Sequence, residues 1–171
     1  ISNKLSEDVN EMEKMLNEYL QFTSTGASEK TEAFDLSDLI KITILKYNNK
    51  NIFFKSENKI LFNGRKNLIQ RCLNNFIDNS LKYGEKVNIS LEKLKNNLFI
   101  FIEDDGPGIS QDEYENVFKP FYKISKGRAD SKSSVGLGLS ISSDIIRSHG
   151  GNIELSPSKF GGLKVKISLP F

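Results

Sequence analysis

The asparagines of the segment NNFIDNSLKYG, residues 74–84, are the first side chains in this sequence that could bind a ligand. Asn75, Asn79 and Lys82 recur at i, i+4 and i+7, so a helix through this segment places them on one stripe. The carbonyl oxygen of Asn79 is a hard, neutral ligand suited to Mg²⁺, which keeps several waters and takes further ligands from phosphates. A solvated polar helix face would have the same composition, so the stripe alone has two interpretations.

A second candidate is the segment EDDGPGI, residues 103–109, which follows five apolar residues typical of a buried strand. Asp-Gly and Pro-Gly pairs form tight turns without any ligand. A carboxylate at the end of a buried strand also suits recognition of a base, because Asp104 can accept a hydrogen bond from an adenine amino group. Gly106 and Gly108 would let the backbone approach the ring. A buried anion without such a partner is unfavourable.

The third candidate is the glycine pair in VGLGLSI, residues 135–141, which opens the predicted helix LSISSDIIRSHGG. Backbone N–H groups at a helix start, together with the helix dipole, favour binding of phosphate oxygens. Such a glycine pair alone is common, and it gains meaning from the segments before it.

With FKPFYK, residues 118–123, these segments resemble, in order, the N, G1, F and G2 boxes of the ATP-binding domain of sensor histidine kinases. The resemblance runs from about Phe34 to Phe171 and implies ATP and Mg²⁺ as ligands. The residues that it assigns to nucleotide binding are Asn75, Asn79, Lys82, Tyr83, Asp104, Gly106, Gly108, Ile109, Phe118, Phe121, Ser134, Gly136, Leu137, Gly138 and Leu139.

The resemblance also implies a role for each motif. Asn79 would bind Mg²⁺, Asn75 and Lys82 would face the phosphates, and Tyr83 would lie against the adenine or ribose. Asp104 would contact adenine, whereas the next residue stands at the variable position of the pattern.

The fourth motif departs from the family at one position. The family usually has Thr or Ser before the first glycine, where this chain has Val135, so Ser134 is the candidate for a hydroxyl contact to phosphate.

The segment FKPFYKISKGRADSKSS, residues 118–134, corresponds to a mobile lid over the nucleotide in the family. Phe118 and Phe121 would anchor its root, and Lys123, Lys126 or Arg128 could reach the γ-phosphate. Without the resemblance, the segment is a basic loop.

No catalytic residue is assigned beyond these candidate lid cations, because the phosphoacceptor histidine of the family is missing. The only histidine, His149, follows a predicted helix and is interpreted as a helix-end residue near the negative pole of the dipole. The resemblance implies that the γ-phosphate passes to a histidine on a helix absent from this chain, for relay to a response regulator.

Two other classes share such a pocket. Gyrase-type, chaperone and mismatch-repair ATPases usually carry Glu one turn before the Mg²⁺-binding Asn, where this chain has Asn75. A neutral amide cannot accept a proton from water, so this position favours the histidine kinases. A nucleotide-sensing module without kinase activity is the remaining alternative.

The helices and strands predicted around these residues indicate an α/β fold, a two-layer sandwich of a mixed sheet with helices on one face. The segment 65–84 has two apolar rows at i, i+4 spacing and predicts a helix. Strands are predicted at NIFF, KILF, KVNISLEKL, NLFIFIEDD and the closing hairpin NIELSPS and GLKVKISLP, and DLSDLIKITILKY predicts a helix capped by its aspartates and serine.

The first 22 residues have a heptad stripe formed by Leu5, Val9, Met12, Leu16 and Tyr19. The resemblance implies that residues 1–23 are the second helix of a dimerisation hairpin and 34–171 the catalytic ATP-binding domain, with 24–33 as a linker. A surface helix packed on the domain is the alternative.

The composition restricts the partners and the compartment. The 24 basic and 22 acidic residues nearly cancel, which gives no basic field for nucleic acid. The single cysteine excludes a disulfide framework and fits a cytoplasmic setting, and no apolar run is long enough to span a bilayer. The resemblance to sensor histidine kinases implies a parent that is an inner-membrane sensor, forms a homodimer through its hairpin and binds a response regulator.

Overall fold

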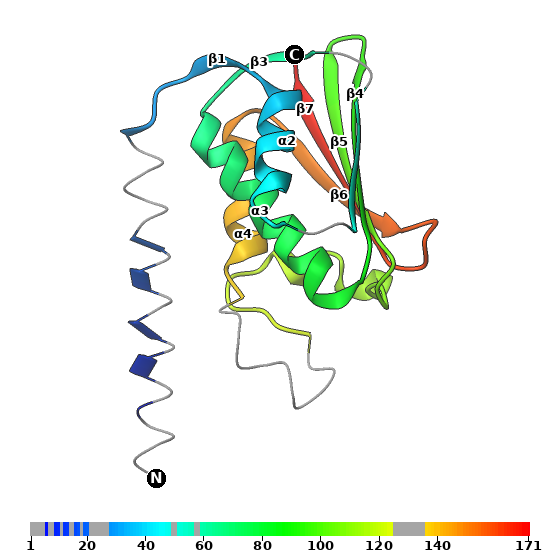
Figure 1. Ribbon diagram of the computed structural model, residues 1–171. Helices are drawn as coiled ribbons and strands as arrows, with labels where there is room; N and C mark the ends of the chain where they lie inside the picture. The colour runs from blue at the N-terminus through cyan, green and yellow to red at the C-terminus, as the bar shows by residue number, and fades with distance from the viewer. Residues whose placement is uncertain are drawn as a thin grey trace.

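A five-stranded mixed sheet and three helices on one of its faces form the domain in the computed structural model (Figure 1). The structure describes residues 6, 9–10, 12–13, 16–17, 19–20, 28–48, 51–56, 59–124 and 136–171. The strands are β1 Glu32–Asp35, β2 Ile52–Ser56, β3 Leu61–Gly64, β4 Val87–Leu94, β5 Asn97–Asp104, β6 Asn152–Pro157 and β7 Leu163–Pro170. The helices are α2 Leu36–Leu45, α3 Lys66–Tyr83 and α4 Gly138–Ser148, with 3-10 turns η1 Gln111–Glu113 and η2 Asn116–Phe118.

The sheet has the order β2-β4-β5-β7-β6, in which β2 and β4 are parallel and the other pairs are antiparallel. Alternate side chains of β4, β5 and β7 point toward the helices and are buried, as the period of a strand requires. The predicted fold class, a two-layer sandwich of a mixed sheet with helices on one face, is confirmed.

The helix α3 lies between α2 and α4 and packs on the sheet with the two predicted apolar rows (Figure 1). Leu68, Cys72 and Phe76 form one row, and all three are almost fully buried. Burial raises the pKa of the Cys72 thiol to about 12, so this cysteine is an apolar core residue. The opposite stripe of α3 is thereby left for polar residues.

The helix α2 begins where the sequence predicts it, because Asp35 caps it. The Asp35 carboxylate accepts hydrogen bonds from the backbone N–H of Ser37 at 2.9 Å and of Asp38 at 3.4 Å.

The structure places a short strand at the end of the predicted linker. The predicted linker, residues 24–33, ends in a strand, because Glu32 and Ala33 belong to β1 and pair with Gly64 and Asn63 of β3. This two-stranded sheet is separate from the main one, so the predicted strand KILF also joins β1 rather than the main sheet. The four residues EAFD of β1 are too few to show an alternating pattern. Their partner strand lies about thirty residues away in the chain, so no neighbouring segment indicates the pairing either.

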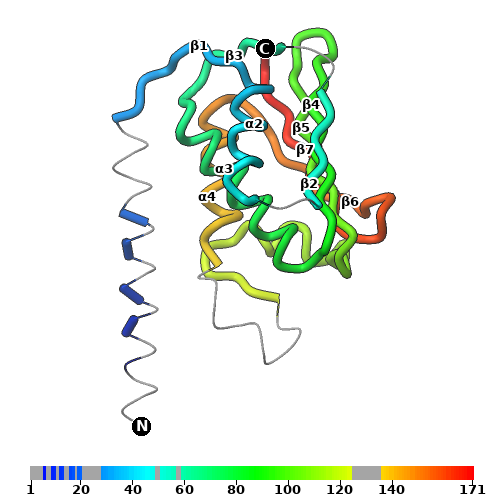
Figure 2. The backbone as a smooth tube through the Cα atoms, viewed as in Figure 1, coloured from blue at the N-terminus to red at the C-terminus, as the bar shows by residue number. Residues whose placement is uncertain are grey.

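The described residues between Ser6 and Leu20 are helical and lie apart from the domain (Figure 2). Val9, Met12, Leu16 and Tyr19 of the predicted stripe are each about half exposed or more. Leu5 lies outside the described residues. The role of this helix in dimerisation stays a prediction, as does the division of the chain into residues 1–23, 24–33 and 34–171. Among the described helices, none has the length and apolar composition needed to cross a membrane.

Candidate nucleotide-binding site

The polar stripe of α3 lies next to the glycine pair at the start of α4. The side-chain amide of Asn75 donates to the Gly138 carbonyl at 2.9 Å and to Ser142 Oγ at 3.0 Å. Ser142 Oγ in turn donates to the same Gly138 carbonyl at 2.8 Å. Asn75 therefore connects the first and fourth motifs directly, and its NH₂ group is used for this connection.

Further along the stripe, Asn79 is half-buried, and no hydrogen bond connects its side chain to another described residue. Its amide oxygen is thus available to a ligand. At the end of α3, Lys82 Nζ lies 5.3 Å from the centroid of the Tyr83 ring, which is 54% exposed. The stripe therefore presents an amide, an ammonium group and an accessible aromatic ring in series.

Asp104 ends the central strand β5 and is buried. Its Oδ1 atom accepts hydrogen bonds from the backbone N–H groups of Gly106 and Leu163, both at 3.0 Å. Neither bond uses Oδ2, which leaves the second oxygen for an external donor such as an amino group. The carboxylate is fixed in orientation before any ligand arrives, as recognition of a base requires.

The turn between β6 and β7 contacts Asp104 so closely that one position must be glycine. A Cβ atom on Gly162 would lie 2.0 Å from Asp104 Oδ1 and 2.5 Å from the Gly106 nitrogen. Gly106 is restricted in the same way, since its Cβ would lie 2.8 Å from the Tyr83 carbonyl oxygen. Gly162 adjoins the candidate site, and the sequence contains no local signal for it, because its partner lies some sixty positions earlier in the chain.

The neighbouring Asp105, predicted to be a variable position, has a defined structural role. Its Oδ1 atom accepts the backbone N–H groups of Glu85 and Lys86, both at 2.8 Å. The hydrogen bond from the Lys86 backbone is the main reason that the pKa of Asp105 lies below its usual value. Asp105 therefore holds the turn after α3 against the second motif, next to Lys82 and Tyr83.

The third and fourth motifs meet through their backbones. The Phe121 N–H donates to the Gly136 carbonyl at 2.9 Å, and both residues have a positive φ, 64° and 77°. Glycine adopts this conformation without strain, and phenylalanine does so rarely. A Cβ on Gly136 would lie 3.0 Å from the Phe121 carbonyl carbon and from the Tyr122 oxygen. These close contacts explain why glycine occupies position 136.

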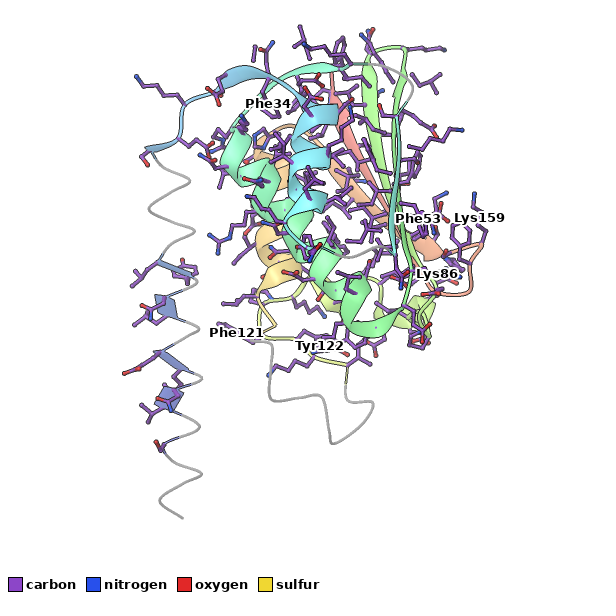
Figure 3. All side chains as sticks on the ribbon, in the orientation of Figure 1. Phe34, Phe53, Lys86, Phe121, Tyr122 and Lys159 are labelled. Atoms are coloured by element: carbon purple, nitrogen blue, oxygen red, sulfur yellow. The ribbon has the colours of Figure 1, made fainter. Side chains whose placement is uncertain are left out.

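The two phenylalanines predicted to anchor the root of the lid differ in burial. Phe118 is half-buried, whereas the side chain of Phe121, which is labelled in Figure 3, is 57% exposed. Phe121 is thus held mainly by its backbone hydrogen bond to Gly136. The buried anchor is Val117. Tyr122 adds a hydrogen bond from its hydroxyl to Glu113 Oε2 at 2.5 Å, and this carboxylate raises the pKa of Tyr122.

Some of the remaining predicted residues lie within the described part of the chain, and the others lie outside it. Leu137 is buried in the core, whereas Gly108, Ile109, Leu139 and Lys123 are partly exposed. Ser134, Lys126, Arg128 and Val135 lie outside the described residues.

The predicted Mg²⁺ would depend on one protein ligand and not on a cluster of ligands. No group of three or more His, Cys, Asp or Glu side chains within the described residues could hold a metal ion. A single amide oxygen, that of Asn79, suits Mg²⁺ that is held mainly by water and substrate phosphates.

His149 lies at the far end of the α3–α4 pair. Its Nε2 accepts the backbone N–H of Arg65 at 3.0 Å, so Nδ1 carries the proton and donates to the Ile145 carbonyl at 2.7 Å. Arg65 immediately precedes α3, and Asn79 lies 14 residues further along it, or ~20 Å at 1.5 Å per residue. Both ring nitrogens are engaged, and the predicted structural role is supported.

Comparison with known proteins identifies the fold and its family. The sequence model of the histidine kinase-, DNA gyrase B- and HSP90-like ATPase family matches residues 64–171. The sensor histidine kinase GtrS of Pseudomonas aeruginosa is 31% identical over 173 aligned positions, which cover 99% of this chain and 36% of GtrS. The sensor histidine kinase CpxA of Escherichia coli is 34% identical over 108 positions, covering 63% of this chain and 24% of CpxA. The histidine kinase domain of the E. coli osmosensor EnvZ superimposes with a TM-score of 0.63 at 29% identity, covering 81% of this chain and 88% of that domain.

The chain belongs to the histidine kinase-, DNA gyrase B- and HSP90-like ATPase family, and within it to the ATP-binding catalytic domains of sensor histidine kinases. The family predicted from the four motifs is thus confirmed. The chain spans about a third of the length of GtrS and about a quarter of CpxA.

Proposed function

We propose that this domain binds ATP with Mg²⁺ and transfers the γ-phosphate to a histidine on a helix outside this chain. One observation carries the proposal. Asn75 hydrogen-bonds Gly138 at one end of the site, and Asp104 is held at the other through Oδ1, with Oδ2 outside both of these hydrogen bonds. Both groups adjoin α3, because Asn75 lies in this helix and the turn that follows it bonds Asp105, the residue after Asp104.

Each group has a role in this proposal. Asp104 Oδ2 accepts the adenine amino group, and the exposed Tyr83 ring lies against the adenine or ribose. The N–H groups at the start of α4 bind phosphate oxygens, as helix N-termini do. Asn79 and Lys82 serve the metal-bound phosphates, and Lys123 or Arg128 are candidates for the γ-phosphate.

The chemistry that these residues can perform is positioning and charge neutralisation. Bound Mg²⁺ would supply neutralisation of the charge that develops on the phosphoryl oxygens. Asn75 cannot act as a general base, and its amide is already bonded to Gly138 and Ser142. The site therefore favours transfer to an imidazole that is itself the nucleophile, over attack by a water that needs activation.

The wider setting is also a proposal. In the parent protein residues 1–23 would contribute to a hairpin that forms a homodimer and carries the phosphoacceptor. A response regulator would receive the phosphoryl group, and the parent would be anchored in the cytoplasmic membrane with this domain on the cytoplasmic side.

Nucleotide titration with and without Mg²⁺ tests the binding site. Asn79→Ala should weaken ADP and ATP binding in Mg²⁺ by about tenfold or more and change it little in EDTA, because its oxygen acts through the metal. Asp104→Asn should weaken the binding of adenine nucleotides equally in both conditions. The substitution replaces an acceptor oxygen by an NH₂ group, which cannot accept a hydrogen bond from the adenine amino group. Equal losses for both variants in both conditions, with unchanged circular dichroism, would contradict the assignment.

A further inference from the structure

The helix that carries Asn75 and Asn79 begins without a cap of its own. Arg65 occupies the N-cap position of α3, and its side chain makes no capping hydrogen bond. No acidic residue lies in the first turn. The first N–H groups of a helix have no partner inside it, so these groups need acceptors from elsewhere.

Those acceptors come from segments that are remote in sequence. Glu29 Oε1 accepts the Asn67 N–H at 2.6 Å, and Glu29 Oε2 accepts the Leu68 N–H at 3.2 Å. His149 Nε2 accepts the Arg65 N–H at 3.0 Å. Glu29 thus bonds the two amides that a local capping side chain would bond, and its negative charge is also favoured by the helix dipole.

Other contacts make this end of α3 a junction of several segments. The Arg65 guanidinium donates to Ser148 at the end of α4. The residue before Arg65, Gly64, pairs with Glu32 of β1. Residues 29 to 32 are therefore attached to the start of α3 twice, once through the Glu29 carboxylate and once through the β1–β3 ladder.

We propose that Glu29 is a positioning residue that fixes the segment entering the domain on the nucleotide-binding helix. Glu29 lies nine positions after Leu20 in the chain, and it bonds the end of α3 opposite to Asn79. The proposed phosphoryl transfer requires the two halves of an active site to meet in a defined geometry, which a fixed entry segment favours. This role rests on the proposed function in one respect, the assignment of α3 as the nucleotide helix.

The test compares backbone amides in the isotopically labelled 171-residue chain and in variants of it. Glu29→Ala should speed hydrogen exchange at Asn67 and Leu68 by roughly 2- to 30-fold, the range for loss of a capping side chain. Glu29→Gln, which keeps an acceptor oxygen, should fall between Glu29→Ala and the unaltered chain. Glu32→Ala is the matched control, because Glu32 is an exposed glutamate of the same segment.

A second readout separates positioning from simple helix capping. The ¹⁵N relaxation of Lys30 and Thr31 should show more backbone motion in Glu29→Ala than in the unaltered chain, and no such increase in the control. Loss of a helix cap alone would change the relaxation of α3 residues only. Unchanged exchange at Asn67 and Leu68 would overturn the contact, and unchanged relaxation at Lys30 and Thr31 would overturn the positioning role. Both measurements are made without nucleotide, so they stand even if the unaltered chain fails to bind ATP, which would refute the proposed function separately.

Discussion

The two adjacent carboxylates at the end of β5 perform different tasks because their backbone surroundings differ. Asp104 is buried and bonds Gly106 and Leu163 through one oxygen, whereas Asp105 is partly exposed and bonds the backbone of Glu85 and Lys86. The first is oriented toward the base site, and the second fixes the turn that follows α3. A sequence pattern identifies the first aspartate through its glycines, but it contains no signal for the second.

At this scale Gly162 gives a sharp steric prediction. Gly162→Ala should weaken adenine nucleotide binding by about tenfold or more, because the added methyl group would overlap Asp104 Oδ1 and displace the carboxylate. The loss should be the same with and without Mg²⁺, as for Asp104→Asn. Lys159→Ala, an exposed change in the same turn, is the control, and isothermal titration measures both variants.

Binding by Gly162→Ala as tight as that of the control would show that the turn relaxes without moving Asp104. A variant that fails to fold would be recognised by its circular dichroism and by the loss of its cooperative thermal transition.

At the scale of elements, α3 and α4 are tied at both ends by side chains. Asn75 bonds the start of α4 near the candidate phosphates, and His149, just after α4, bonds the residue before α3. Packing of apolar rows places the helices side by side, and these polar ties fix how far one can slide along the other. The geometry of the nucleotide site therefore depends on contacts at a distance from it.

The tie at His149 predicts a dependence of stability on pH. Burial is the main reason that the pKa of His149 lies below 6.5, and the nearby Arg65 lowers it further, against the opposing effects of the Ile145 carbonyl and Glu29. The unfolded chain then binds a proton more readily than the folded one, so stability is full above pH 6.5 and falls as the pH drops below it.

Denaturant unfolding at pH 7.5 and 5.5 measures this effect. We expect a lower midpoint at pH 5.5 for the unaltered chain and a smaller difference in His149→Gln, which is less stable at pH 7.5. An equal pH difference in both proteins would assign the dependence to other groups.

The elements themselves differ in how far sequence predicts them. The helix α3 and the hairpin of β6 and β7 follow from periodicity and turn residues that lie within each segment. The strand β1 could not be predicted, because its four residues are a strand only through pairing with β3. Glu29, Asp105 and Gly162 were missed for the same reason, since each acts on a partner some twenty to sixty positions away.

For the molecule as a whole, the separation of its single histidine from the nucleotide site decides what the isolated chain can do. His149 lies ~20 Å along the helix pair from Asn79, with both ring nitrogens hydrogen-bonded. A phosphoacceptor needs a ring nitrogen that is exposed and aligned with the γ-phosphate at near-attack distance. Neither condition holds for His149, so the ATP half of a kinase site is present here without its acceptor.

This chain should therefore bind ATP and leave itself unphosphorylated. Incubation with γ-labelled ATP and Mg²⁺ should give no acid-labile label on the protein, and hydrolysis should be slow because Asn75 offers no base. Addition of a separate helical hairpin that contains a phosphoacceptor histidine should give label on the hairpin alone, at a rate limited by weak association of the two parts. Acid-labile label on the isolated chain that disappears in His149→Ala would contradict this division, because it would require the end of α4 to reach the phosphates.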